Sequence, residues 1–107
     1  KVDGAKNDFD ALKIARKISS SSLVKTAIHG CDPNWGRIIS AAGSSGVDFK
    51  LSDVDLFIGE YQILNSGHLI QFDKEEISFY LRSKMKGQYL VSDTVEIIII
   101  SILSMMT

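Results

Sequence analysis

The fold of this chain is decided by residues 29–46, which read HGCDPNWGRIISAAGSSG. Asp32 is placed to accept hydrogen bonds from the first free amides of a helix, and Pro33 stands where a helix needs no amide proton. Gly43 suits the left-handed conformation that often follows the last helical residue. The pattern predicts a short helix that begins at the Asp-Pro pair and has an inward face made of Trp35, Ile38, Ile39 and Ala42.

The residues before this stretch predict a helix and then a strand. Apolar side chains recur at helical spacing between Asp8 and Ile18, with Asp8 available as the N-cap. The hydroxyl side chains of Ser19–Ser22 favour caps and turns, so this run should end the helix. Residues 23–28, LVKTAI, alternate and contain β-branched side chains, which favours an extended segment.

The residues after it predict a hairpin. Val54, Leu56 and Ile58 alternate with more polar neighbours and are followed by Gly59, which is typical of a strand. Tyr61–Leu64 is expected to pair with this strand as the second arm.

A helix and a last strand complete the expected order. Asp73 and Glu76 form an Asp variant of the capping box, and Gly87 would end the helix that they begin. The isoleucine-rich Val95–Ile100 suits a central strand that is covered on both faces. The order α, β, α, β, β, α, β predicts a mixed α/β layered domain. The buried stripe of the capped helix is expected to contain Ile77, Tyr80, Leu81 and Met85.

Bulk composition places the chain among globular proteins. With 107 residues it is long enough for one small domain or part of a larger one, and its 45% apolar and 23% charged content is ordinary for a packed core. The net charge of -1 gives no basis for nucleic-acid binding, which draws on clustered Lys and Arg. The first residue, Lys1, suggests that upstream sequence has been lost.

Location follows from the cysteine count and the apolar runs. Cys31 is the single cysteine, so a reducing, cytoplasmic environment is expected, or an organelle in a eukaryote. The apolar run at residues 97–106 is shorter than the roughly 18 to 20 residues that a bilayer crossing needs, so no membrane association is expected.

Residues that could carry chemistry mostly favour a structural interpretation. His29 and Cys31 beside Asp32 could form an activated thiol or a partial metal site, yet the spacing guarantees no contact and His68 is the only other histidine. Packing is therefore the favoured interpretation, with no metal and no cofactor. The acidic pairs Asp53/Asp55 and Glu75/Glu76 are expected to be solvated.

An anion site is the main binding hypothesis from the residues alone. The helix N-terminus expected at Pro33 would offer free amides and a positive dipole end, with Lys25, Asn34 and Arg37 nearby in sequence. The alternative is that Asp32 already satisfies those amides. The glycines and serines of residues 43–46 lack the Lys-Ser/Thr pair of a phosphate loop, so a turn is expected there.

Residues 21–46, SSLVKTAIHGCDPNWGRIISAAGSSG, closely resemble the hallmark of the ornithine acetyltransferase/N-acetylglutamate synthase family. The six consecutive residues DPNWGR make the match specific. Looser, collinear similarity extends over roughly residues 1–98. The resemblance implies a DmpA/ornithine-acetyltransferase-like fold, with residues 1–107 forming a single partial domain from the β-chain region.

The resemblance also implies an activity for the whole enzyme. It would transfer acetyl from N-acetylornithine to glutamate in arginine biosynthesis, and bifunctional members also use acetyl-CoA as a substrate. Autocatalytic cleavage exposes the threonine nucleophile of the family, whose motif is absent from this sequence. No catalytic residue can be carried over, so this fragment is expected to be inactive alone and to need the remaining α- and β-chain segments, in an oligomer.

The signature residues are expected to shape the architecture around the site more than to touch substrate: Asp32, Pro33, Asn34, Trp35, Gly36 and Arg37. Two departures from the family stand out. The apolar end IIIISILSMMT stands where the family has a Gly- and Asp-containing segment, which indicates truncation, a frameshift or divergence. Cys31 stands where the family often has an acidic or small residue. The alternatives are a non-catalytic α/β binding or assembly module and a stand-alone anion-binding protein.

Overall fold

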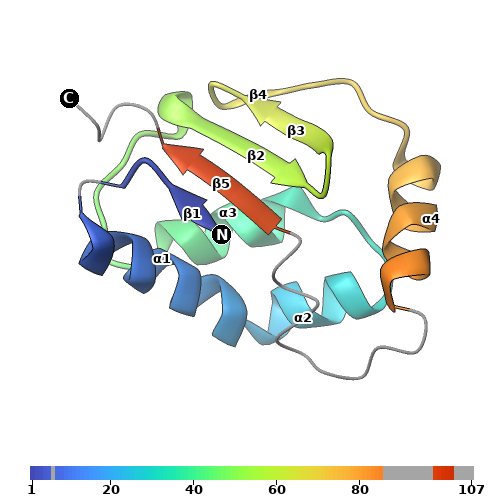
Figure 1. The fold of residues 1–107 in the computed structure, drawn as a ribbon, viewed down its shortest axis with the longest axis horizontal. Helices are drawn as coiled ribbons and strands as arrows, with labels where there is room; N and C mark the ends of the chain where they lie inside the picture. The colour runs from blue at the N-terminus through green and yellow to red at the C-terminus, as the bar shows by residue number, and fades with distance from the viewer. Residues whose placement is uncertain (6, 86–97, 103–107) are drawn as a thin grey trace.

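The computed structural model describes residues 1–5, 7–85 and 98–102, and it shows one mixed five-stranded sheet with helices packed against it (Figure 1). The mixed α/β architecture expected from the sequence is therefore confirmed. The elements in chain order are β1 (Val2–Asp3), α1 (Asp8–Ser20), α2 (Ser22–His29), α3 (Trp35–Gly43), the 3-10 turn η1 (Leu51–Asp53), β2 (Val54–Ile58), β3 (Tyr61–Asn65), β4 (His68–Leu69), α4 (Lys74–Met85) and β5 (Ile98–Ile102).

The last strand, β5, lies inside the sheet, whose order is β1-β5-β2-β3-β4. It runs parallel to β1, with Val2 opposite Ile100, and antiparallel to β2, with Leu56 opposite the same isoleucine. The prediction that this strand lies inside the sheet is confirmed, whereas its expected cover on both faces stays a prediction. Residues 95–97 of the predicted span lie outside the described residues.

One face of the sheet forms the core with the helices. Val54, Leu56 and Ile58 are buried and alternate with half-buried neighbours, as their period of two predicts. They belong to one apolar cluster with buried residues of α1, α2 and α3, including Ile14, Ile28 and Ile38. Figure 1 shows α1, α2 and α3 on the same side of the sheet and α4 at its end, beside the turn between β2 and β3.

Residues 23–28 are helical, so the predicted strand is wrong. Ser21 ends α1 by donating its amide to the Ile18 carbonyl, and its Oγ accepts from the Val24 amide at 3.2 Å to cap α2. Val24, Ala27 and Ile28 are the buried residues of α2, and their spacing is helical. The six-residue stretch 23–28 fits the spacing of a strand as well as that of a helix. The Ser21 cap and the burial of Val24, Ala27 and Ile28 favour the helix.

The N-cap of α1 is also one residue away from its predicted place. Asn7 precedes the helix in an extended conformation, and its Oδ1 accepts from the Asp10 amide at 2.8 Å. Asp8 is instead the first helical residue, where its negative charge interacts favourably with the positive end of the helix dipole.

The hairpin and the cap of α4 by Asp73 agree with their predictions, but the Glu76 carboxylate accepts from the Tyr61 hydroxyl and does not complete the predicted capping box. β2 and β3 pair antiparallel, and Asp73 Oδ1 accepts from the amides of Glu75 and Glu76 at 2.9 and 3.2 Å. Of the predicted stripe, Ile77 and Leu81 are fully buried and Tyr80 packs against the core. The Met85 side chain and Gly87 lie outside what the structure describes. The short strands β1 and β4 are absent from the sequence prediction, because two residues carry no recognisable period.

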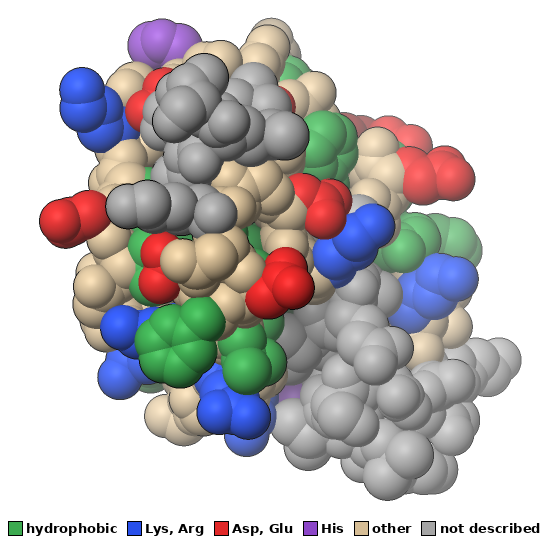
Figure 2. Space-filling view, turned by 60° about the vertical axis from the view of Figure 1, so that its left-hand side comes forward, with side chains coloured by type: hydrophobic (Ala, Val, Ile, Leu, Met, Phe, Trp, Pro, Cys, Tyr) green, Lys and Arg blue, Asp and Glu red, His purple; other side chains and the backbone are tan. Residues whose placement is uncertain are grey.

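Charges of both signs are spread over the molecular surface. On the face drawn in Figure 2, acidic and basic side chains are interspersed, in keeping with a net charge of -1. Within the described residues, every helix is too short or too polar to cross a membrane.

Candidate functional site

The signature residues form the connection between α2 and α3, and the first part of this connection ends α2. The Cys31 amide donates to the Ile28 carbonyl at 2.9 Å, and the Asp32 amide donates to the Ala27 carbonyl at 2.8 Å. This pair of bonds is the Schellman ending of a helix, which places one residue in the left-handed region. That residue is Cys31, with φ of 57°. The backbone of Asp32 therefore belongs to the end of α2.

Asn34 caps α3, so the predicted N-cap, Asp32, and the predicted first helical residue, Pro33, each lie two positions too early. The Asn34 Oδ1 accepts from the Arg37 amide at 3.2 Å, and α3 begins at Trp35. The Asp32 carboxylate instead accepts from Asn34 Nδ2 at 3.3 Å and lies 4.0 Å from Lys74 Nζ. Pro33 is buried before the cap. Asp32 thus orients the capping residue and does not bind the helix amides itself.

The far end of α3 differs in the same way. Gly43 is the last helical residue and Ser44 is the C-cap, whereas the left-handed glycine of this region is Gly46 with φ of 86°. The inward face is largely as predicted. Ile38 and Ala42 are buried, Trp35 and Ile39 are half-buried against the core, and the burial of Ala41 is an addition to the predicted face.

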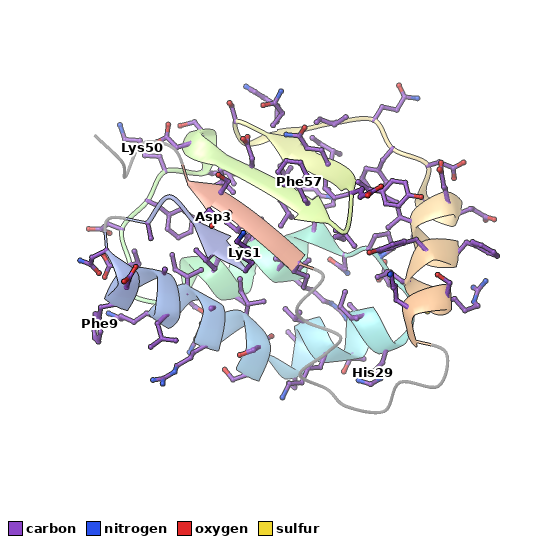
Figure 3. All side chains as sticks on the ribbon, viewed as in Figure 1. Lys1, Asp3, Phe9, His29, Lys50 and Phe57 are labelled. Carbon is purple, nitrogen blue, oxygen red and sulfur yellow. The ribbon has the colours of Figure 1, made fainter. Side chains whose placement is uncertain are left out.

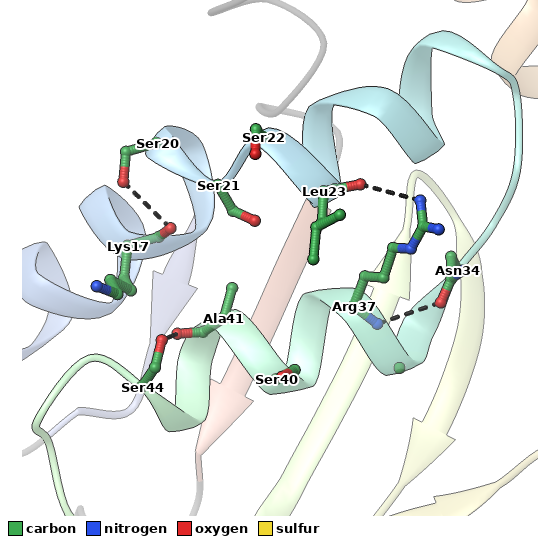
Figure 4. A pocket seen from close by; sticks show the side chains of 11 residues that line it. Lys17, Ser20, Ser21, Ser22, Leu23, Asn34, Arg37, Ser40, Ala41 and Ser44 are labelled. Atoms are coloured by element: carbon green, nitrogen blue, oxygen red, sulfur yellow. Dashed lines mark hydrogen bonds between the residues drawn. The ribbon is translucent and has the colours of Figure 1, made fainter.

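Arg37 ties α3 back to the beginning of α2. Its Nη1 donates to the Leu23 carbonyl at 3.3 Å, while its backbone amide is held by the Asn34 cap (Figure 4). One residue therefore ties the first turn of α3 to the first turn of α2. These two bonds give Arg37 a role in the packing of α3 on α2, whereas the role of the signature around a catalytic site stays a prediction.

A groove with a volume of about 730 Å³ lies beside the hydrogen bond between Arg37 and Leu23. Figure 4 shows the end of α1 and the start of α2 on one side and α3 on the other. Asn34 and Arg37 line the groove. Lys25 is half-buried on α2 and is not one of the lining residues. The described lining consists of Lys17, Ser20, Ser21, Ser22, Leu23, Asn34, Gly36, Arg37, Ser40, Ala41 and Ser44.

Lys17 and the serines of this groove are functional candidates that sequence reasoning missed. The sequence predicts that residues 23–28, between Lys17 and Arg37, form a strand. With that strand in place of α2, there is no reason to expect the two cations in one groove. The serine run was the available signal. Ser20 Oγ donates to the Lys17 carbonyl at 3.3 Å, and Ser44 Oγ donates to the Ala41 carbonyl at 2.9 Å, so these two hydroxyls are engaged within their own helices.

The other candidate residues do not assemble into a reactive site. His29 is exposed at the end of α2 and points outward (Figure 3), while Cys31 packs against the core. His68 is exposed on β4. Among the described residues, no three His, Cys, Asp or Glu side chains gather as metal ligands would.

Glu75 and Glu76 are exposed, as expected, Asp53 and Asp55 are half-buried, and one residue of each pair makes a hydrogen bond within the fold. Asp55 Oδ1 accepts from the Ser66 amide at 2.8 Å in the loop after β3. Glu76 Oε1 accepts from the Tyr61 hydroxyl at 3.3 Å, and the Tyr61 ring meets the Tyr80 ring edge-on with centroids 5.5 Å apart. Partial burial raises the pKa of Tyr61 above its ordinary value of 10.0, and the negative charge of Glu76 raises the pKa further. This cluster fastens α4 to the hairpin.

Comparisons with known proteins agree on one family. A family model described as the ArgJ family matches residues 1–99. The Arginine biosynthesis bifunctional protein ArgJ of Prochlorococcus marinus subsp. pastoris is 59% identical over 96 residues, covering 90% of this chain and 24% of that protein. The protein of the same name from Dehalococcoides mccartyi is 53% identical over 81 residues, which cover 76% of this chain and 20% of that protein.

A solved structure agrees with the sequence comparisons. The crystal structure of the Arginine biosynthesis bifunctional protein ArgJ from Bacillus halodurans superimposes with a TM-score of 0.76 at 38% identity. The match covers 94% of this chain and 42% of that chain. This chain thus spans about a quarter of the length of the curated relatives. The family resemblance predicted from the sequence is confirmed, and because the family model covers residues 1–99, the chain belongs to the ArgJ family.

Proposed function

We propose that this chain is a segment of a glutamate N-acetyltransferase of arginine biosynthesis, which moves acetyl from N-acetylornithine to glutamate and also accepts acetyl-CoA. The single observation that carries the proposal is the family match over residues 1–99, which includes the complete signature. The relatives named above are called bifunctional proteins of arginine biosynthesis, which supports the same pathway for this chain.

The proposed reaction is acyl transfer through a covalent intermediate. A threonine hydroxyl, exposed by self-cleavage of the chain, attacks the acetyl carbon, and the amine of ornithine leaves with a proton. The amine of glutamate then attacks the acetyl ester and restores the hydroxyl. In support of a divided polypeptide, this chain covers 42% of the crystallised Bacillus chain but only 24% of the Prochlorococcus protein.

In this proposal, the described residues supply the scaffold and another segment supplies the nucleophile. The connection from Asp32 to Arg37 ends α2, caps α3 and clamps the two helices together. A displacement of reacting groups by about 1 Å can reduce a rate about a hundredfold, so a rigid turn beside the site has catalytic value without touching substrate. The 107-residue chain alone is accordingly proposed to be inactive.

The decisive experiment is an assay of the full-length gene product with N-acetylornithine carrying an isotopic label in its acetyl group. We expect labelled N-acetylglutamate to form only when glutamate is present. Without glutamate, intact-mass analysis should show one acetyl group on the protein. A folded full-length protein that neither transfers nor retains the label would favour a non-catalytic α/β assembly module.

The partners and location follow the same proposal. The remaining α- and β-chain segments would complete the subunit, subunits would associate into an oligomer, and the enzyme would work in the cytoplasm, or in an organelle in a eukaryote. Co-purification of two fragments of one gene product, followed by measurement of the particle mass, would test the first two points.

A further inference from the structure

We draw no further inference here: the strongest candidate, the outward face of α1 on which Phe9 and Leu12 are 68% and 45% exposed, carries none, because nothing in the described part of the chain shows what covers that face and the chain spans about a quarter of the length of its curated relatives.

Discussion

The guanidinium of Arg37 in α3 holds the backbone carbonyl of Leu23 in the first turn of α2 at 3.3 Å. The bond joins positions fourteen residues apart, across the Asp-Pro-Asn connection. It gives the arginine of the signature a structural task that is independent of any substrate.

We expect Arg37→Ala to lower the free energy of unfolding by about 1 kcal/mol, the usual cost of one partly exposed hydrogen bond. Urea denaturation of the full-length protein would measure the change. Lys25→Ala is the control, because Lys25 is a half-buried cation on α2 that takes no part in the hydrogen bond between Arg37 and Leu23. An equal loss of unfolding free energy in the two variants would show that the hydrogen bond between Arg37 and Leu23 adds no stability of its own.

A glycine at position 31 should make the protein more stable than an alanine there. In most positions of a helix the alanine variant is the more stable one. Cys31 has φ of 57°, and the left-handed conformation costs a residue with a Cβ about 1 to 2 kcal/mol. Both variants lose the thiol, so their difference isolates the backbone. Denaturation should find Cys31→Gly more stable than Cys31→Ala by about 1 kcal/mol. A more stable alanine variant would contradict the Schellman ending of α2.

Gly43 should show the opposite preference, because it lies inside the last turn of α3 and an added Cβ would meet only open space. Gly43→Ala is expected to stabilise the protein by about 0.5 to 1 kcal/mol. Gly67→Ala is the contrasting variant. Gly67 has φ of 76°, and a Cβ there would collide with the carbonyl oxygen of Leu51, so a loss larger than about 1 kcal/mol is expected.

Positions 31 and 43 also show why helix ends are hard to locate from the sequence. The sequence predicts Gly43 as the left-handed residue after α3, which follows a sound rule about helix ends. The rule does not locate the residue, because Ser44 and Ser45 continue the turn and Gly46 takes the positive φ. After α2, Cys31 takes that conformation, although the glycine beside it, Gly30, is the C-cap with φ of -82°.

The hairpin strands and α4 are predictable because their signals are local. Alternation in β2 and the Asp73 cap of α4 each lie within a few residues. The groove is not predictable, since residues of α1, α2 and α3 come to line it only through the packing of α1 and α2 against α3. Of the three binding candidates that the sequence suggests, Asn34 and Arg37 reach the groove and Lys25 does not.

Tyr61 provides a prediction on pH. Its pKa is raised above 10.0, first by partial burial and then by Glu76, so the folded state disfavours the phenolate. The protonated tyrosine therefore stabilises the fold below the ordinary pKa, and this contribution is lost as the pH rises through the raised value. NMR titration of labelled tyrosine should find Tyr61 ionising later than a free tyrosine. Glu76→Gln should lower that pKa, and an unchanged value would argue against the contact.

The place of β5 between β1 and β2 bears on how the polypeptide folds as it leaves the ribosome. β1 and β2 emerge early, yet the strand that separates them is translated some forty residues after β2. Pairing such distant segments is slow, because a long loop must close before the contacts form. Until then, β1 and the edge of β2 expose unpaired backbone groups, which are open to non-native pairing.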